Sequence, residues 1–585
     1  MQTRVSRRDF LAMSAKGVGA AVISYGLMGC SSDSDKYVKA DFLHGIASGD
    51  PTHESVILWT RVTPEKQGEA KVSWQVATDS NFDNIVTDGE MITTAERDYT
   101  VKVDAIGLRS GQGYYYRFRT NKKYSVVGHT KTLPQGEVAK VKLAVMSCSN
   151  YPAGYFNVYE MASKMADLDA VVHLGDYIYE YDAKGYGSER AEELGRVSEP
   201  KHEILSLTDY RLRYAQYRTD LSLQNIHKTT PFIAVWDDHE VSNDTYKDGA
   251  ENHDEKTEGS FEARKEAALQ AYFEWLPIRP WREGNHEQIY RSFQFGDLVD
   301  LYMLDTRIIG RDKQLDIKRY ISSSGFEADR FRADVTNTDR TMLGQEQLTW
   351  LQGQLLQSTA KWQVLGQQVL MGRMLLPAAI ATRRLSVEQY ATLGALAKLA
   401  ARAKANDPTL TPEELQKLAA NQHLLTPEVL AALKLPNIPY NLDAWDGYAY
   451  EREVILTTAK SKNHNLVVLA GDTHNAWANE LKNTKGEAIG VEFATASVTS
   501  PGLERYLNIA PEKARATEAG IVQLVEDLKY MNSRDRGFMT VEFTHQKVST
   551  EWHFVDTITS KSFKALEERY TKASTKAGEM KVMMG

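Results

Sequence analysis

The stretch Asp169-Ala-Val-Val-His-Leu174, followed by Gly175-Asp176-Tyr177-Ile178-Tyr179, decides the fold of this chain. A short run of Val and Leu that stops at a glycine and an acid predicts a buried strand ending at a tight turn. Open α/β sheets bind their ligands at the carboxyl ends of the strands. We therefore expect Asp176 at the centre of a site, with the phenol of Tyr179 within reach of it.

Three more apolar runs stop at ionisable residues in the same way. Lys142–Ser147 is followed by Cys148, Pro231–Trp236 by Asp237-Asp238-His239-Glu240, and Asn465–Ala470 by Gly471-Asp472-Thr473-His474. A single acid after a strand is often a helix N-cap, and a single histidine is often structural. Several acids at one sheet edge repel one another unless cations are present. The repetition therefore predicts a metal site.

Length and charge set the class of protein. A chain of 585 residues is too long for one hydrophobic core, which predicts two or more domains. Its net charge of −8 is mild and argues against nucleic acid as the main partner. An anionic substrate would have to be attracted by cations held locally.

Residues 1–30 are expected to be a targeting segment outside the fold. Ser6-Arg7-Arg8-Asp9-Phe10-Leu11 is a twin-arginine pattern that precedes a weakly apolar segment. Leu27-Met28-Gly29-Cys30 resembles a bacterial lipobox, so we expect Cys30 to be lipidated; cleavage without lipid is the alternative. The predicted partners are the twin-arginine export machinery and a lipid anchor in the membrane. The predicted location is the periplasm or the cell surface.

The next segments form a linker and a small domain. Residues 31–40 are typical of a flexible tether. Residues 41–138 carry short β-like runs separated by turn residues every ten or so positions, which predicts a β-sandwich similar to a fibronectin type III module.

Residues 139–558 are expected to form the catalytic α/β domain. The stretch at about 375–435 is rich in Ala, Leu and Lys with helical periodicity, which predicts a helical insertion acting as a lid or a cap. Three late β runs (491–494, 538–543 and 550–554) are candidates for a second sheet, and residues 559–585 are expected to form a charged helical tail.

Cys148 has no disulfide partner once Cys30 is committed to a lipid, because the chain contains only 2 cysteines. A lone thiol in an exported protein is at risk of oxidation. Two interpretations remain open at this point, a buried structural cysteine and a thiolate that binds a metal.

The strand-end motifs resemble those of the metallophosphoesterases. Typical members have Asn where this chain has Asp238 and His where it has Asp472, and the spacing of Asp176 and Tyr179 is similar to the purple acid phosphatase motif, whose tyrosine binds ferric iron. The whole pattern resembles the alkaline phosphatase D family. Its hallmarks are Ser48-Gly49-Asp50-Pro51, Leu58-Trp59-Thr60-Arg61, Trp236-Asp-Asp-His-Glu-Val241, Leu304-Asp-Thr-Arg307 and Trp445-Asp446-Gly447-Tyr448. The resemblance covers residues 43 to 557 and implies a two-sheet sandwich flanked by helices.

The resemblance also implies iron(III), held by Cys148, Asp176, Tyr179 and His474. A phenolate and a thiolate need a strongly polarising ion to stay deprotonated. Judged from ligand types alone zinc would compete, although tyrosine suits zinc poorly.

A second ion is expected beside the first. Asp176, Asp238 and Asp472 offer only oxygen atoms, which favours a hard cation such as Ca²⁺. Asp176 would then bridge both ions. Asn150 and Asn243 are further candidate oxygen donors or phosphate contacts.

The predicted reaction is hydrolysis of a phosphate ester by in-line attack of a metal-bound hydroxide. Beside the ligand Asp176, the catalytic candidate is His239, which could donate a proton to the leaving alkoxide or hold a phosphate oxygen. The alternative is that His239 only orients Asp238. Arg307 could contact the phosphate or form a structural ion pair.

We expect a secreted alkaline phosphatase that scavenges phosphate from small phosphomonoesters. The resemblance also permits a phosphodiesterase or a phospholipase D-like enzyme. A cap that narrows the pocket would favour monoesters, and an open groove would admit diesters. A hypothesis from another class is a non-catalytic lipoprotein that uses its β-sandwich to bind surface polymers.

Overall fold

The computed structural model describes residues 36–282, 284–322, 325–439 and 441–585. The expected targeting segment, with its twin-arginine pattern and Cys30, lies outside the described residues. Among the helices that are described, none has the length and apolar character needed to cross a bilayer.

Two large sheets pack through one shared hydrophobic core. The ten-stranded sheet has the order β28 (Met583–Met584), β27 (Thr571–Lys576), β26 (Lys547–Phe554), β25 (Gly537–Phe543), β11 (Val141–Met146), β12 (Ala170–His173), β13 (Phe232–Ala234), β2 (Ile46–Gly49), β3 (Ser55–Arg61) and β7 (Thr100–Ile106). The seven-stranded sheet has the order β14 (Arg291–Phe295), β15 (Val299–Met303), β18 (Trp362–Gly366), β21 (Leu466–Ala470), β23 (Ala488–Ala494), β22 (Ala476–Lys482) and β24 (Leu528–Asn532). The chain is therefore mixed α/β with several sheets.

Parallel pairing brings the site residues to one edge. β11, β12 and β13 are parallel to one another in one sheet, and β15, β18 and β21 are parallel in the other. Every residue of β12 is buried, as its unbroken apolar run predicts. The carboxyl ends of these strands carry the acids that the sequence singled out.

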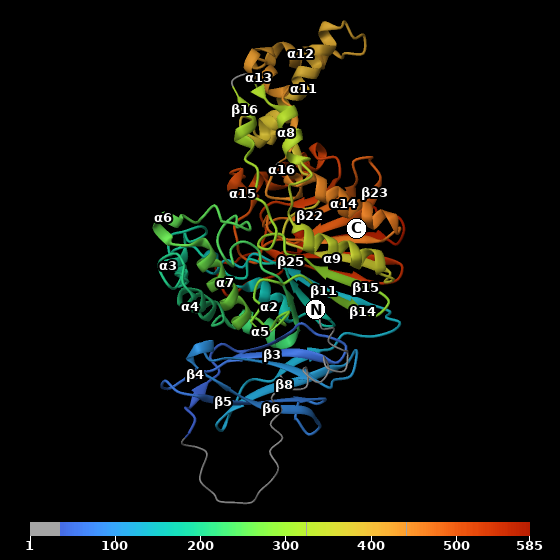
Figure 1. The fold of residues 1–585 in the computed structure, drawn as a ribbon. Helices are drawn as coiled ribbons and strands as arrows, with labels where there is room; N and C mark the ends of the chain where they lie inside the picture. The colour runs from blue at the N-terminus through green and yellow to red at the C-terminus, as the bar shows by residue number, and fades with distance from the viewer. Residues whose placement is uncertain (1–35, 283, 323–324, 440) are drawn as a thin grey trace, which may run out of the picture.

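Helices cover the two sheets (Figure 1). Those that pack into the shared core are α2 (Asn157–Ser163), α4 (Leu207–Tyr217), α5 (Leu221–Thr229) and α7 (Phe261–Trp275). Those that share a second core with the seven-stranded sheet include α9 (Gly344–Gln357), α14 (Ala449–Ser461) and α16 (Ala514–Leu524). Further helices are α3 (Ala191–Leu194), α6 (Glu255–Glu258), α8 (Ala328–Val335) and α15 (Leu503–Tyr506).

The N-terminal module is less independent than expected. A separate five-stranded sheet packs through its own core on β3 and β7; its strands are β10 (Gly128–Lys131), β8 (Gly113–Thr120), β5 (Ala70–Ala77), β6 (Ile85–Thr93) and β9 (Lys123–Tyr124). However, β2 pairs with β13, which joins β2, β3 and β7 to the catalytic sheet. This close approach needs Gly49, because a Cβ there would lie 2.3 Å from the Pro277 carbonyl oxygen. The module at 41–138 thus shares a sheet with the catalytic body, and its likeness to a fibronectin type III module stays a prediction.

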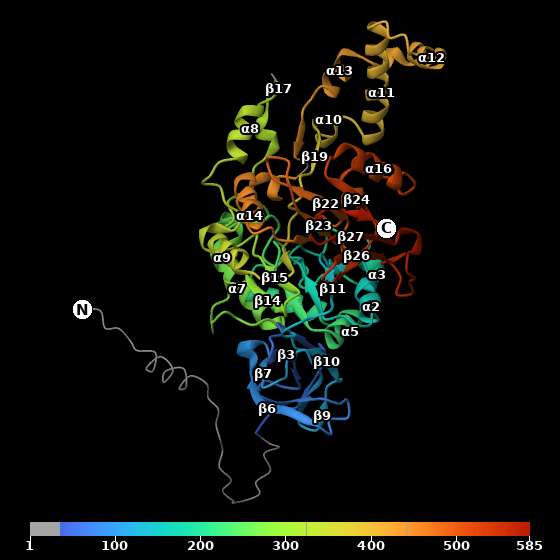
Figure 2. The same ribbon diagram turned by 90° about the vertical axis from the view of Figure 1, so that its right-hand side faces the viewer.

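The 375–435 segment is helical and projects from the body on the side away from the N-terminal module (Figures 1 and 2). It comprises α10 (Ala378–Ala381), α11 (Val387–Lys404), α12 (Pro412–Asn421) and α13 (Pro427–Leu433). A hairpin of β19 (Leu375–Pro377) and β20 (Asn437–Pro439) closes its base. α11 packs on α16, which fixes the insertion to the body. Two small strand pairs remain: β1 (Ala40–Asp41) with β4 (Thr63–Pro64), and β16 (Ile321–Ser322) with β17 (Gly325–Phe326).

Two expectations for the C-terminal part are wrong. The late run at 491–494 joins the seven-stranded sheet as part of β23, whereas those at 538–543 and 550–554 join the ten-stranded sheet as β25 and β26. The expected helical tail at 559–585 instead ends in β27 and β28. Ala573 and Thr575 point into the core between exposed lysines, so the two-residue period of a strand holds despite the charge.

Candidate metal centre

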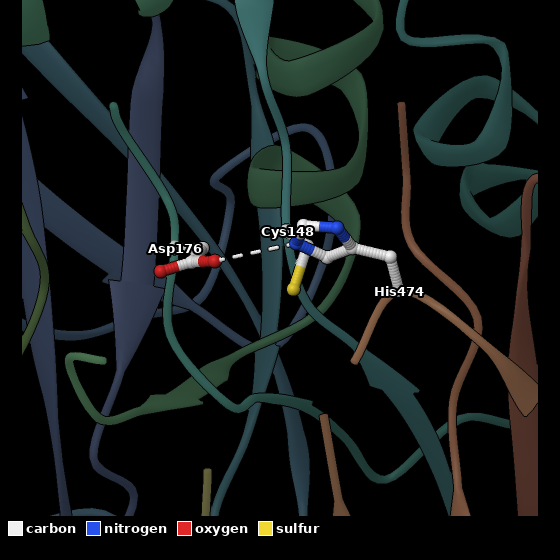
Figure 3. A group of neighbouring side chains, drawn as sticks. All are labelled: Cys148, Asp176 and His474. Atoms are coloured by element: carbon white, nitrogen blue, oxygen red, sulfur yellow. Dashed lines mark ion pairs between the residues drawn. The ribbon is translucent and has the colours of Figure 1, made fainter. Parts of the chain in front are cut away.

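Four strand ends meet in one cluster. One ligand atom from each of Cys148, Asp176 and His474 lies within 4.8 Å of the others, and Figure 3 shows the three side chains pointing toward one another. Two further groups obey the same limit: Asp176 with Asp238 and His239, and Asp237 with Asp238 and Asp472. Asp176 and Asp238 each belong to two groups, so the three groups form one continuous cluster.

Tyr179 completes the first group. Its hydroxyl donates to Oδ2 of Asp176 at 2.8 Å and lies 3.1 Å from Nε2 of His474. The hydroxyl of Ser500 donates to the Tyr179 oxygen at 2.6 Å. Burial, and then the charge of Asp176, raise the pKa of the Tyr179 phenol and of the Cys148 thiol. A strongly polarising cation would therefore be needed to hold either group deprotonated.

His474 is held with one ring nitrogen facing the cluster. Its Nδ1 lies 2.7 Å from the carbonyl oxygen of Pro501 and 3.1 Å from the hydroxyl of Tyr186. A carbonyl beside Nδ1 favours the tautomer with the proton on that atom. Nε2 is then free to bind an ion.

Three acids, Asp237, Asp443 and Asp472, surround Arg307. This guanidinium is fully buried and pairs with Asp237 at 2.5 Å, Asp443 at 2.7 Å and Asp472 at 2.7 Å. Burial and then neighbouring carboxylates raise the pKa of Asp237 and Asp472, although Arg307 opposes the rise. One buried cation thus holds several acids together without neutralising them all.

This geometry bears on the sequence expectation for Arg307. The cavity above the cluster is not lined by Arg307, whose nitrogens are already engaged by carboxylates. Of the two roles weighed for this residue, the contacts are those of a structural ion pair and not of a phosphate contact.

His239 lines the cavity, and its ring contacts a buried carboxylate. Its Nδ1 lies 2.7 Å from Oε2 of the fully buried Glu180, and its ring packs on Tyr179 with centroids 4.2 Å apart. Burial alone would lower the pKa of His239, but the carboxylates of Asp238 and Glu180 hold it well above its ordinary value. A protonated imidazole with Nε2–H directed away from Glu180 is a suitable proton donor.

The two asparagines differ in position. Asn150 is buried, and its Nδ2 donates to the carbonyl of Tyr186 at 2.9 Å. Asn243 lines the cavity, but its Nδ2 is engaged by Glu251 at 2.7 Å. Asn150 also has a buried Oδ1 with no hydrogen-bond partner among the described residues.

Backbone strain is concentrated at the cluster. Cys148, Asp176, Asp472 and His474 all have positive φ values, between 55° and 64°. Each left-handed non-glycine residue costs about 1–2 kcal/mol. Such strain is typical of functional sites, where the surrounding structure enforces it. Gly175 permits the turn, because at φ 102° a Cβ there would lie 2.4 Å from the backbone nitrogen of Asp237.

The donor set fits two cations. Within the described part of the chain, Oδ1 of Asp176 and Oδ2 of Asp237 are buried without a hydrogen-bond partner. Buried carboxylate oxygens are rarely left in this state unless an ion or water satisfies them. Cys148, Asp176 and His474 offer sulfur, oxygen and nitrogen donors, whereas Asp237, Asp238 and Asp472 offer only oxygens, so two different ions suit the two halves of the cluster.

A cavity of about 330 Å³ opens above the cluster. Its floor contains Asp176, Asp238, Asp472 and His474, and His239 lies beside them. The base of the helical insertion and α15 supply its walls. The insertion therefore narrows the approach to the candidate ions.

Several site residues escaped sequence reasoning. Glu180 directly follows the predicted Tyr179, and Asp237 lies inside a quoted motif, so both were within reach of the pattern. Tyr186, Asp443 and Ser500 lie in loops, and although Asp443 follows β20 and Ser500 follows β23, neither stands in an apolar-run-and-acid pattern that the sequence singled out. Only the folded chain brings those three to the cluster.

Comparisons with known proteins agree with this geometry. Residues 143–552 match the family described as "PhoD-like phosphatase", and residues 29–134 match its N-terminal domain. Alkaline phosphatase D of Bacillus subtilis (strain 168) is 36% identical over 479 residues, which cover 79% of this chain and 70% of that protein. A solved structure described as "Structure of PhoD" is similar with a TM-score of 0.73 and 30% identity, covering 95% of this chain and 93% of the other.

Proposed function

This chain belongs to the PhoD-like phosphatase family and is a phosphoric ester hydrolase, and from that premise we propose that it is a two-metal alkaline phosphatase acting on small phosphomonoesters. The observation that carries the proposal is the convergence of Cys148, Asp176, Tyr179 and His474 beside a set of acids at the floor of one cavity.

The ions proposed are iron(III) in the first group and Ca²⁺ among the oxygens of Asp176, Asp238 and Asp472. The mixed donors of the first group support a polarising ion, and the all-oxygen second group supports a hard one. When bound, such a pair supplies positive charge against the phosphoryl group and an activated water for in-line attack.

The chain's own residues have defined tasks in this scheme. Asp176 belongs to the group with Cys148 and His474 and to the group with Asp238, so its carboxylate would supply an oxygen to each ion. His239 donates its Nε2 proton to the leaving oxygen, and Glu180 keeps the ring protonated and aligned. Arg307 holds Asp237, Asp443 and Asp472 in place through its ion pairs. Asn150, with its free Oδ1, is a candidate further ligand.

The size of the cavity supports phosphomonoesters as substrates, and not the diesters that a phosphodiesterase or a phospholipase D-like enzyme would hydrolyse. Its volume is about 330 Å³, and the insertion forms one of its walls. A phosphomonoester places one substituent in this space, whereas a diester needs room for two. The non-catalytic binding hypothesis finds no support in the intact donor set.

Export remains part of the proposal. The twin-arginine pattern at residues 6–11 and the lipobox-like Cys30 support secretion by the twin-arginine route and anchoring by lipid at the periplasmic or cell surface. Twin-arginine export carries folded proteins, which suits a chain that acquires its metal in the cytoplasm.

The test compares p-nitrophenyl phosphate with bis(p-nitrophenyl) phosphate before and after calcium chelation. We expect the monoester to be hydrolysed faster, and chelation to abolish activity that added Ca²⁺ restores. The Asp472→Asn variant should need more Ca²⁺, whereas Asp527→Asn, in a distant ion pair with Lys482, should not. A faster diester reaction would reverse the substrate assignment, and no reaction with either ester would contradict the proposed function.

A further inference from the structure

The cavity has walls that contribute no candidate metal ligand. One wall comes from the base of the helical insertion and contains Leu376, Ile380 and Arg383. The facing residues Tyr506 and Leu507 come from α15 and the position after it. Leu376 and Ile380 are almost fully buried, so this wall is fixed and apolar. It borders the same space as the candidate metal ligands Asp176, Asp238 and His474.

Arg383 is the one cationic side chain of Lys or Arg type on the described lining of this cavity. It is exposed, and in the part of the chain that the structure describes its guanidinium makes no hydrogen bond or ion pair. Arg307 beneath the floor is in the opposite state, because its nitrogens are engaged by carboxylates. Arg383 is therefore available to a ligand.

The backbone at Arg383 is strained. Its φ is 57°, and its N–H donates to the Ile380 carbonyl at 2.8 Å where α10 ends. This left-handed position after a helix normally takes glycine or asparagine. Glycine would adopt this conformation without strain. Strained residues concentrate at functional sites, so the strain at Arg383 points to a functional side chain.

Tyr506 lines the same cavity as His239, the candidate proton donor. An alcohol that leaves by accepting the His239 proton would then pass between Tyr506 and the apolar wall. Its far end would meet Arg383 at the mouth.

We propose that Arg383 is a specificity-determining residue that pairs with an anionic group on the leaving alcohol. This inference rests on the proposed phosphomonoesterase function. The substrate class it names is phosphomonoesters whose alcohol has an apolar or aromatic body and a second negative charge at its far end.

The experiment uses the full metal-loaded protein with two esters, phenyl phosphate and 4-carboxyphenyl phosphate. We expect wild-type protein to prefer the carboxylated ester in kcat/KM. Arg383→Gln should remove about five- to tenfold of kcat/KM for that ester, through KM, and change phenyl phosphate less than about twofold. Arg383→Lys should retain part of the preference. Arg384→Gln, at an adjacent exposed arginine outside the cavity lining, is the matched control and should change neither ester.

A second variant, compared with Arg383→Gln, separates strain from charge. Arg383→Gly removes both the guanidinium and the strained Cβ, so we expect a higher melting temperature together with loss of the preference. Equal treatment of the two esters by wild type, or an equal loss for both in Arg383→Gln, would overturn this inference alone. Failure of wild type to hydrolyse either ester would overturn the proposed function and this inference with it.

Discussion

Nδ1 of His239 lies 2.7 Å from Oε2 of Glu180, which has no exposed surface. Glu180 also accepts from the backbone N–H of Asn243 at 2.8 Å and from Nδ2 of Asn252 at 2.9 Å. These bonds fix the carboxylate, and the carboxylate fixes the ring. The orientation of the proton donor His239 is therefore fixed by Glu180, a residue that does not line the cavity.

The first prediction concerns this pair. Glu180→Gln should lower kcat by about 10- to 100-fold, because a neutral amide neither orients the imidazole nor stabilises its protonated form. KM for p-nitrophenyl phosphate should change little, since the candidate metal ligands are untouched. Steady-state kinetics check this, with Glu193→Gln in an exposed ion pair as the control. Wild-type kcat in Glu180→Gln would show that His239 acts without its partner.

The second prediction concerns Arg307. Arg307→Met should cost about 3–5 kcal/mol of unfolding free energy in calcium-free protein, because buried carboxylates lose their counter-charge. Added Ca²⁺ should restore part of the loss by supplying positive charge to the same acids. Arg307→Lys should rescue only partly, since an ammonium does not span three carboxylates as a guanidinium does.

Urea unfolding with and without Ca²⁺ measures both effects. The control is Arg330→Met, in an exposed pair with Glu327. Equal stability of Arg307→Met and wild type in calcium-free buffer would refute the structural role of this arginine.

The third prediction concerns pH and the buried His173. Burial lowers the pKa of His173 to about 3, and its Nε2 lies 2.8 Å from the hydroxyl of Tyr159. The unfolded chain binds the proton near pH 6.5, so between pH 6.5 and 3 the unfolded state holds more protons than the folded one. Stability contributed by neutral His173 is therefore full above pH 6.5 and falls as the pH drops below it.

The comparison of wild type with His173→Gln isolates this residue. Their difference in unfolding free energy should move by about 1–2 kcal/mol in favour of the variant between pH 7 and pH 5. Urea titrations at the two pH values give the numbers. A difference that does not change with pH would mean that His173 is not held neutral.

Local sequence patterns predicted most of the residues that meet in the cluster. Cys148, Asp176, Asp238 and His474 all follow apolar strands, and strand direction alone sends such residues to one edge. Tyr186 and Asp443 could not be assigned in the same way, because their roles depend on side chains that approach from distant segments.

The errors have the same origin. Pairing of Gly49 with Phe232 joins segments far apart in the chain, so the N-terminal module seemed separate from the catalytic sheet. The lysines around Ala573 suggested a helix, although β27 tolerates them equally well because they lie on its exposed face. Both segments take their structure from strand pairing between residues far apart in the chain, which a local sequence pattern does not record.

The visible absorption spectrum of the purified protein, measured with its metal content, tests the central claim most directly. The account predicts bound iron together with calcium, and a violet colour from the Tyr179 phenolate on ferric iron. Tyr179→Phe should bleach this colour, whereas Tyr181→Phe, whose ring also packs on His239 but which is not a candidate ligand, should keep it. A colourless active protein that contains only zinc, or an unchanged spectrum in Tyr179→Phe, would contradict the account.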